Sequence, residues 1–422
     1  MNKLDITQNI LSSYINNITQ SPAQRTNEWY ELRKTTFGGS EISALLGNNP
    51  YKGLKSLIAE KIGFNTFHGN TATRWGTLFE YTTAKCTEYV LNIRDGIKET
   101  GSIEGIISRQ RYSPDGLATV KLVNHHDKYE YYIILFEFKA PLGTLPNHKI
   151  PKHYQSQIQT GLLNIPISDY AIFVNNCYRR CALKDLKFNG IYDKCFHNGD
   201  YKKLANGLCN EIPYACGIIC FYQTKENYNK TDEYFNYNSD DESCKWSYNK
   251  DFSDIDRNIF LNDDNTFIDF GNADLVITNR LFELLDYKRI QPVYSPITFN
   301  NSIINKLDFV NTHNLKKNIN NSSSLDDAKQ FIQQCINQCG NDKLLIGYLP
   351  WKLMRSDIIL EERNTNWFNT IKEPVNNAIT LLDEILKSSD PLQTFNDKFP
   401  PVELTDLSCC DDDIKELNEF MK

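Results

Sequence analysis

The residues best placed for chemistry are an aspartate in a turn and a Glu-Phe-Lys triplet at the end of an apolar run. Asp115 lies in SPDG, and Glu137-Phe138-Lys139 lies in LFEFKAP. Alternate side chains of a strand share one face, so we expect Glu137 and Lys139 to point the same way and Phe138 to point into the core. The spacing between Asp115 and Glu137 suits a hairpin that returns to the same sheet edge. Two carboxylates there predict a Mg²⁺ site that keeps several waters, and Lys139 would orient a metal-activated water attacking a phosphodiester.

An E-x-K triplet alone is weak evidence, because short motifs often match by chance and exposed strand ends commonly carry such pairs. The preceding run YYIILFEF (131–138) is apolar enough to be a buried central strand. Charged residues are rare in such strands unless they are paired or bind a metal. This context favours a functional site.

Three further groups of polar residues have both a functional and an ordinary interpretation. Glu80 in RWGTLFEYTTAK lies on a predicted helix, where a lone glutamate is normally solvated. The same holds for the glutamines of HYQSQIQTGL, of which Gln157 shares a helix face with Tyr154. Arg33 and Ser40 flank FGG before a short helix. Arginine and a helix amino terminus can bind phosphate, although the residues alone favour a capping role for Ser40.

The helices and strands that would position these residues are predicted from the spacing of apolar residues and from residues that end such elements. Ser40 to Gly47 predicts a compact helix that begins at a Ser cap and ends at a Gly. The other predicted elements up to residue 176 are a helix at about 72–91, strands around 101–109, 116–124 and 131–138, a helix at about 151–163 and a strand at 170–174. This order predicts an α/β (α+β) fold with a central mixed sheet flanked by helices.

The chain divides by composition into three parts. We expect a polar leader at 1–24 that can pack as a helix, a core at 25–200 and a carboxy-terminal extension at 201–422. Two polar stretches predict loops in the extension, an acidic insertion at 225–265 and an Asn-rich segment at 311–324. Its expected ordered elements are helices at about 325–338 and 374–387 and a strand at 343–348.

Charge is distributed unevenly along the chain, whose net charge is −7. Residues 1–200 carry 23 Lys and Arg against 18 Asp and Glu, and the remainder carries 23 against 35. A local basic surface governs phosphate binding, so a polyanion would bind the first half. The sequence has no membrane-length apolar run or amino-terminal signal pattern, which predicts a soluble intracellular protein. Its 12 cysteines form no paired metal-binding motif, and we expect reduced thiols and no zinc site.

Six elements in order resemble the YqaJ viral recombinase family, which includes the phage lambda-type exonucleases of the PD-(D/E)XK nuclease superfamily. They are WYELR (29–33), GGS (38–40), WGTLFE (75–80), SPDG (113–116), FEFK (136–139) and YQSQIQ (154–159). The resemblance covers about residues 26–176. The fragment GYLPWKL (347–353) is similar to exonuclease segments of large DNA viruses.

The resemblance implies a PD-(D/E)XK core and a role for each matched residue. Asp115, Glu137 and the carbonyl of Phe138 would hold the catalytic Mg²⁺, for which Mn²⁺ could substitute, and Lys139 would activate the water. Glu80 and Gln157 would serve a second metal position or the water network. Arg33 and Ser40 would hold the 5′-terminal phosphate of the digested strand.

The predicted function is a Mg²⁺-dependent 5′-to-3′ exonuclease that degrades one strand of double-stranded DNA from its end, in viral recombination, repair or genome processing. Its expected partners are duplex ends and a single-strand annealing protein, in the host cytoplasm or nucleus where viral DNA replicates. A structure-selective endonuclease or an RNA-cleaving relative on the same metal core is the first alternative. A non-catalytic DNA-binding recombination protein is the second. Both a monomer and a ring-shaped oligomer stay open.

Overall fold

The computed structural model describes ten parts of the chain: residues 2–18, 22, 27–64, 69–123, 128–186, 215–224, 267–286, 290–300, 324–339 and 343–400. Two predicted loops are affected. The acidic insertion at 225–265 lies outside the described residues, and so does the Asn-rich segment at 311–324 except for its last residue.

A mixed eight-stranded sheet forms the centre of the protein, with the main path β10-β7-β11-β6-β5-β4. Strand β8 pairs with β11 and β9 pairs with β7. The pairs β5–β6 and β8–β11 are parallel and the others are antiparallel. The strands are β4 (Gly116–Val123), β5 (Tyr129–Lys139), β6 (Tyr170–Arg180), β7 (Ala215–Thr224), β8 (Ile268–Asp269), β9 (Ile290–Tyr294), β10 (Thr298–Phe299) and β11 (Lys343–Glu362). The predicted central mixed sheet is confirmed.

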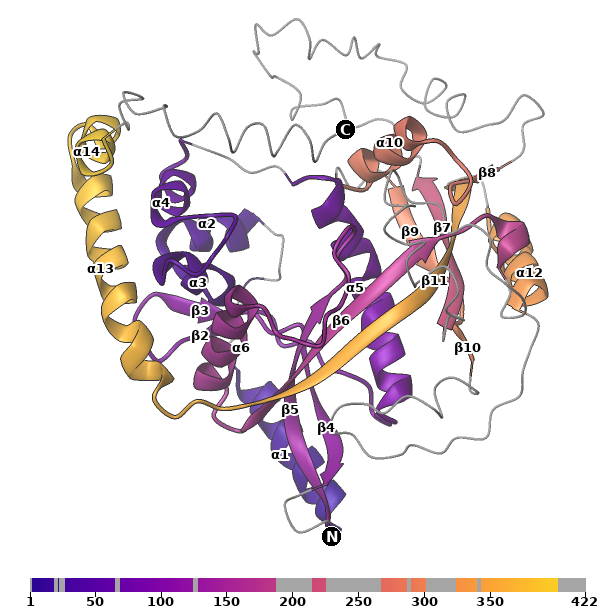
Figure 1. Cartoon of the computed structure of the whole chain (residues 1–422), viewed down its shortest axis with the longest axis horizontal. Helices are drawn as coiled ribbons and strands as arrows, with labels where there is room; N and C mark the ends of the chain where they lie inside the picture. Colours follow the sequence, from indigo (N-terminus) through magenta and orange to yellow (C-terminus); the bar gives the residue numbers. More distant parts are fainter. Residues whose placement is uncertain are drawn as a thin grey trace, which may run out of the picture.

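Helices cover both faces of this sheet (Figure 1). Helix α5 packs on one face of β5, against Ile134 and Phe136, while α6 and α1 pack on the other, against Leu135. The helices are α1 (Lys3–Asn17), α2 (Asn27–Thr35), α3 (Ile42–Leu45), α4 (Leu54–Lys61), α5 (Thr71–Val90), α6 (Lys152–Asn164), α10 (Leu275–Asp286), α12 (Ser324–Asn337), α13 (Trp367–Lys387) and α14 (Pro391–Lys398). Successive side chains of β5 therefore point into two different hydrophobic cores, one on each face of the sheet.

Strand β11 is much longer than the predicted strand at 343–348. Its 20 residues pair with β7 over the first half and with β6 over the second, and it crosses the molecule diagonally in Figure 1. The prediction stopped early because Lys352, Arg355 and Asp357 interrupt the apolar pattern. Lys352 and Asp357 are nevertheless buried, and the backbone is held extended by pairing with β7 as far as Leu353 and with β6 from Trp351 onward. The sheet thus continues across the predicted boundary at residue 200.

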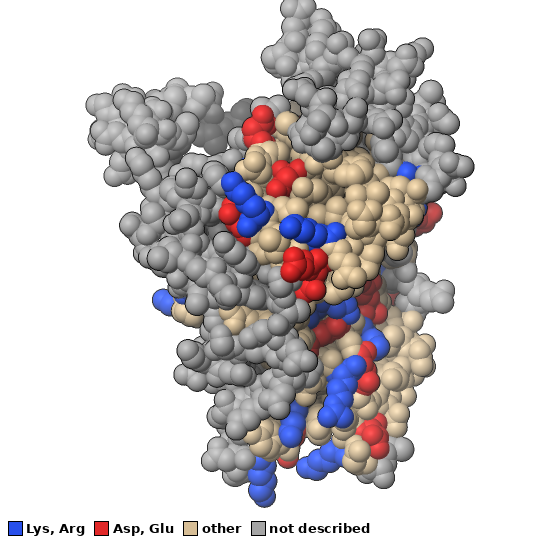
Figure 2. Space-filling model, turned by 90° about the vertical axis from the view of Figure 1, so that its right-hand side faces the viewer, with Lys and Arg blue, Asp and Glu red and all other residues tan. Residues whose placement is uncertain are grey.

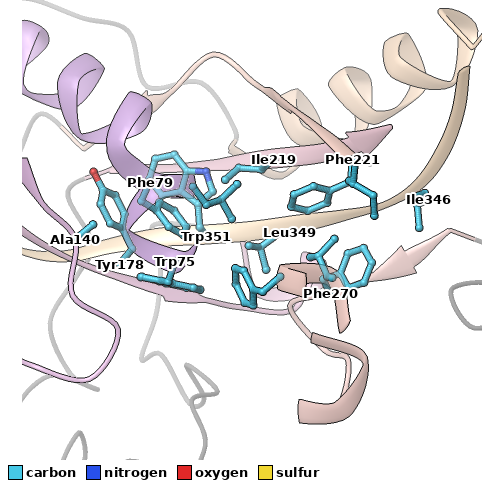
Figure 3. Packing of buried hydrophobic residues seen from close by; sticks show 14 of the residues in the cluster. Trp75, Phe79, Ala140, Tyr178, Ile219, Phe221, Phe270, Ile346, Leu349 and Trp351 are labelled. Carbon is cyan, nitrogen blue, oxygen red and sulfur yellow. The ribbon is translucent and has the colours of Figure 1, made fainter. Parts of the chain in front are cut away.

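A large aromatic cluster fixes α5 against β6 and β11 (Figure 3). The ring of Phe79 stacks on Tyr178 at 4.4 Å between centroids, and Trp351 meets Tyr178 edge-on at 5.4 Å. Helix α5 begins where the side chain of Asn70 accepts the backbone N–H of Thr73 at 3.0 Å, a favoured capping contact. The helix that carries Glu80 is therefore defined by a cap at its start and by buried aromatic rings along its length.

A small sheet of order β1-β3-β2 lies beside the main sheet. Its strands are β1 (Phe37–Gly38), β2 (Ile103–Glu104) and β3 (Gln110–Tyr112). The predicted strand around 101–109 is wrong over most of its length. Gly105 leaves no room for a side chain next to Gln110, and Arg109 has a φ of 60°, so the chain turns between β2 and β3.

Other predicted elements agree with the structure. The helices predicted at about 72–91, 151–163 and 325–338 correspond to α5, α6 and α12, and the leader contains α1. The helix predicted from residue 374 begins earlier, at Trp367, and runs through Pro374, because Ile371 and Val375 pack on one buried face. Seven cysteines fall within the described residues, and all are free thiols. None of the helices in this part of the chain is long and apolar enough to span a membrane.

Candidate active site

The hairpin of β4 and β5 brings Asp115 next to the Glu-Phe-Lys triplet. Gly116 pairs with Phe136 in the antiparallel register, so Asp115 directly precedes β4 at the position opposite Glu137. Oδ2 of Asp115 accepts a hydrogen bond from the backbone N–H of Phe138 at 2.6 Å. The structure therefore brings Asp115 and Glu137 together at one edge of the sheet, as their spacing predicts.

Glu137 is a buried carboxylate with two side-chain partners. The hydroxyl of Tyr112 donates to Oε2 at 3.0 Å, and Lys139 forms an ion pair with Oε1. A buried charge is tolerated only with such partners. Each carboxylate oxygen has two lone pairs, so both retain an acceptor position for a cation.

The charges of this site act on one another strongly. Burial raises the pKa of Asp115 well above its usual range, and the charges of Glu137 and Glu80 raise it further, while Lys139 opposes them. Burial alone would lower the pKa of Lys139, but the charges of Glu137 and Asp115 outweigh it and raise that pKa. Lys139 therefore stays positively charged. A cation bound here would reduce the repulsion between the carboxylates of Asp115 and Glu137.

The residues present fit a hard divalent cation. Asp115 and Glu137 offer carboxylate oxygens and Phe138 a backbone carbonyl, the ligand types that Mg²⁺ prefers. Within the described ranges there is no group of three or more His, Cys, Asp or Glu side chains that could hold a metal. A cation here would therefore keep several waters. The charge of Glu80 on α5 raises the pKa of Asp115, so Glu80 lies close enough to this site to interact with it electrostatically.

One cavity of about 220 Å³ is lined both by Asp115 and by the predicted phosphate-binding residues. Arg33, Ser40, Asp115 and Gln157 all line it. They come from α2, the turn after β1, the start of β4 and α6. Residues 124 positions apart in the sequence are therefore brought to one cavity.

Arg33 is held in this cavity by a buried acid. Its Nη2 donates to Oε1 of Glu41 at 2.9 Å, and its guanidinium lies 4.6 Å from the ring centroid of Trp29. Glu41 also accepts from Lys61 Nζ at 3.0 Å and from the backbone N–H of Gly38 at 2.8 Å. Burial would raise the pKa of Glu41, but Lys61 and Arg33 more than compensate and lower it. Glu41 thus stays ionised and orients Arg33.

The predicted capping role of Ser40 is wrong. Residues Gly39–Glu41 form a 3₁₀ turn before the four-residue helix α3, so Ser40 lies inside this turn and is exposed. Glu41 accepts the free N–H of Gly38 in its place. The tight turn arises because Gly39 packs on Tyr112, whose ring leaves no room for a Cβ. The predicted Gly stop is present, since Gly47 has a φ of +67°.

Sequence reasoning missed several residues of this cavity. Arg111, Tyr112 and Ser113 line it from β3 and the following turn. Nε and Nη2 of Arg111 donate to the hydroxyl and carbonyl oxygens of Ser102, each at 3.0 Å. The available signal was the position of these residues directly before Asp115 in RYSPD.

The glutamines of α6 have separate partners. Gln157 lines the cavity, whereas Gln155 and Gln159 donate to Glu361 of β11 at 3.1 and 2.8 Å. Gln159 is buried, so it is not a surface residue. Tyr154 places its ring 4.8 Å from Nζ of Lys139, a cation–π contact that helps to hold the lysine. Helix α6 therefore links the acids to the carboxy-terminal part.

Comparison with known proteins gives one family and several relatives. Residues 28–164 match the family described as YqaJ-like viral recombinase domain. Protein D345L of African swine fever virus, strain Badajoz 1971 Vero-adapted, is 29% identical over 237 residues, which cover 51% of this chain and 65% of that protein. Protein D345L of isolate Tick/South Africa/Pretoriuskop Pr4/1996 is 30% identical over 227 residues, which cover 49% and 62%. The matches thus span less than two thirds of these relatives.

Two solved structures are also similar over part of the chain. They are an alkaline exonuclease (LHK-Exo) from Laribacter hongkongensis and LHK-Exo in complex with dAMP. Their TM-scores are 0.28 and 0.27, each at 20% identity, and each match covers 36% of this chain and 74% of the other.

Proposed function

We propose that the protein is a metal-dependent deoxyribonuclease of the PD-(D/E)XK kind, because residues 28–164 match the family described as YqaJ-like viral recombinase domain. Its proposed activity is 5′-to-3′ digestion of one strand of double-stranded DNA, in viral recombination, repair or genome processing. The observation that carries the proposal is the cavity shared by Arg33, Ser40 and Asp115.

The size of this cavity supports recognition of a strand end. Its volume of about 220 Å³ is smaller than the roughly 300–1,000 Å³ of typical small-molecule sites. A terminal phosphate with its sugar suits this space better than an uninterrupted duplex does. Arg33 and Arg111 supply guanidinium groups, which bind phosphate in a fork geometry.

The chain's own residues have distinct tasks in this proposal. Asp115, Glu137 and the carbonyl of Phe138 would hold Mg²⁺, with Mn²⁺ as a substitute and Glu80 and Gln157 near a second position. When bound, the metal would lower the pKa of a coordinated water and neutralise charge on the phosphate. Lys139, kept protonated by its two acids, would orient the water and stabilise charge that develops on the phosphate oxygens. Arg33 would fix the register of the strand by holding its 5′ end.

The face of the protein seen in Figure 2 has mixed charge over the described residues. On the face seen in Figure 2, Lys and Arg side chains lie among Asp and Glu over the described residues. The positive balance belongs to residues 1–200, the part that contains the cavity. In this proposal, binding depends on a few directed contacts near the strand end.

Linear and circular duplexes test the proposal. We expect the full-length protein to digest linear duplex with Mg²⁺, to spare covalently closed circles and to be inactive with EDTA. Cleavage of circles would favour the structure-selective endonuclease, and cleavage of neither substrate would favour the non-catalytic recombination protein. Digestion of a single-stranded RNA in the same assay would point to the RNA-cleaving relative.

The nature of the 5′ end tests direction. Duplexes with a 5′ phosphate should be degraded faster than duplexes with a 5′ hydroxyl, and Arg33→Ala should remove most of the difference. A charge-assisted contact of about 1.5–3 kcal/mol corresponds to roughly ten- to a hundredfold. Because Arg33 is already paired with Glu41, we expect the lower end of this range. Equal rates for both ends, or digestion from the 3′ end, would contradict the assigned polarity.

A further inference from the structure

A row of polar residues crosses the sheet from Lys139 into the carboxy-terminal part. Lys139 of β5 pairs with Asn175 of β6, and Asn175 pairs with Asp357 of β11. Directly paired residues lie on the same face of a sheet, and neighbouring strands are about 4.8 Å apart. The backbone at Asp357 is therefore about 10 Å from that at Lys139, on the same face. Strand β11 lies outside the segment that matches the family.

Asp357 holds His148, which lies on the loop between β5 and α6. The backbone N–H of His148 donates to Oδ2 of Asp357 at 2.5 Å, and Nδ1 of its ring lies 2.9 Å from Oδ1. Nη2 of Arg355 lies 2.7 Å from Nε2 of the same ring. Arginine has only donors, so Nε2 accepts from Arg355, and Nδ1 lies on the side of the ring next to the carboxylate. A chain Arg355–His148–Asp357 results.

The three side chains of this row of contacts differ in exposure. The side chain of Asp357 is 1% exposed, whereas those of His148 and Arg355 are 63% and 30% exposed. His148 has a φ of 59°, a region that such residues rarely adopt, and the two contacts with Asp357 hold it there. A buried carboxylate therefore fixes two accessible nitrogen-bearing side chains next to the row that contains Lys139.

Asn175, in the middle of the row, is an independent sign of a polar site. It is 7% exposed, and its side-chain oxygen is buried with no hydrogen-bond partner within the part of the chain that the structure describes. Buried polar groups are normally paired. The sheet therefore keeps an unsatisfied amide between the predicted catalytic lysine and the Arg355–His148–Asp357 chain.

We propose that Arg355 and His148 bind a backbone phosphate of the DNA duplex a few nucleotides from the strand end held at Asp115 and Arg33. The guanidinium would exchange its contact with the imidazole for a phosphate oxygen, the ligand for which its planar fork is suited. The separation of about 10 Å corresponds to about three rises of 3.4 Å along a duplex. This inference rests on the proposed function and assigns the carboxy-terminal strand a role in holding substrate.

Salt dependence of DNA binding tests this site separately from cleavage. The full-length protein is titrated with a 5′-phosphorylated duplex of about 20 base pairs in EDTA, across about 50–200 mM salt. Each phosphate contact contributes nearly one unit to the slope of log K against log salt. Arg355→Ala should weaken binding and reduce this slope by about one unit, and Arg355→Gln should do the same.

A matched control is Lys387→Ala, which removes an equally charged residue on the outer helix α13. Its side chain is 79% exposed and pairs only weakly, at 3.6 Å, with Asp383. This variant should keep the wild-type slope. His148→Gln should weaken binding less than Arg355→Ala does, because an amide can still donate to phosphate.

The outcomes separate the two proposals. A wild type that neither binds nor digests duplex DNA contradicts the proposed function itself. A wild type that digests DNA while Arg355→Ala and Arg355→Gln keep its affinity and salt slope contradicts the phosphate site alone. Equal losses of slope in the Arg355 variants and in Lys387→Ala would also overturn it, because the effect would then be one of net charge.

Discussion

The hydroxyl of Tyr112 donates to the buried carboxylate of Glu137 at 3.0 Å and so joins two parts of the site. The ring of Tyr112 also packs on Gly39 and Gly161 so closely that neither glycine could carry a Cβ. Gly39 belongs to the turn beside Arg33, and Gly161 belongs to α6. One tyrosine thus fixes the distance between the predicted phosphate-binding turn and the predicted metal ligand.

Tyr112→Phe should therefore impair catalysis more than folding. The ring and its packing remain, but Glu137 loses a neutral donor, and a hydrogen bond to a charged group contributes about 1.5–3 kcal/mol. We expect slower linear-duplex digestion and a need for more Mg²⁺ at half-maximal rate. Tyr132→Phe is the control, since its hydroxyl donates to the more exposed Glu130. Equal Mg²⁺ requirements in wild type and Tyr112→Phe would show that Glu137 does not need this donor.

Lys139→Ala should abolish cleavage and leave DNA binding in EDTA largely intact. Lys139 contacts Glu137 and the ring of Tyr154, and it lies with the acids and not with the arginines that are proposed to bind the strand end. Groups that move protons or stabilise charge in this way contribute on the order of 10²–10⁴ in rate. Single-turnover rates and duplex affinity are measured on the same preparation. A variant that keeps more than about a tenth of the wild-type rate would remove Lys139 from the reaction.

Asp115→Asn and Glu137→Gln should each weaken Mg²⁺ binding, because an amide does not neutralise a cation. Without metal, Asp115→Asn should not destabilise the protein. Burial and Glu137 disfavour its charged form, while an amide oxygen can still accept from the N–H of Phe138. We expect Asp115→Asn to unfold at a temperature equal to or higher than wild type in EDTA. Unchanged Mg²⁺ affinity by calorimetry in both variants would place the metal elsewhere.

The sequence predicted the parts of the site that depend on local pattern. The spacing between Asp115 and Glu137 predicted that a hairpin brings them together, and the apolar run at 131–138 predicted a buried strand. The roles of these residues in catalysis stay predictions. Arg111 and Tyr112 were missed because their importance comes from β3 pairing with β1 and from packing on α6. Such contacts join distant segments and leave no periodic signal.

Long-range pairing also explains the largest error in the fold. Nothing local in 349–362 resembles a strand, since charged residues break the alternation. The segment is extended because it pairs with β7 as far as Leu353 and with β6 from Trp351 onward. Asp357 is stable there because His148, more than 200 residues away, binds it. The expected capping role of Ser40 was also wrong because of contacts between distant segments. Glu41 accepts the N–H of Gly38 instead, and Lys61 and Arg33 keep Glu41 ionised.

The cluster around Glu41 should make the stability of the fold sensitive to acid. Lys61 is buried and donates to Glu41 at 3.0 Å and to the carbonyls of Arg33 and Thr36 at 3.0 and 2.6 Å. Removing one partner of a buried pair costs about 3–5 kcal/mol, because the other charge is left uncompensated. Glu41→Gln should therefore destabilise the protein strongly at pH 7, as measured by urea unfolding.

The pH dependence follows from the direction of the Glu41 shift. Its pKa is lower in the folded protein than in the unfolded chain, where it is about 4.3. The ionised group thus stabilises the fold fully above about pH 4.3, and this contribution is lost as the pH falls through the lowered folded value. The difference in unfolding free energy between wild type and Glu41→Gln should be constant from pH 7 to about 5 and should shrink below about 4.3. Glu31→Gln is the matched control, because its pair with Lys34 is 2.6 Å long but lies on the surface, where such pairs contribute about 0–1 kcal/mol. If Glu41→Gln unfolds like Glu31→Gln at pH 7, the cluster does not hold Arg33 in place, and the 5′-phosphate preference should then survive in Glu41→Gln.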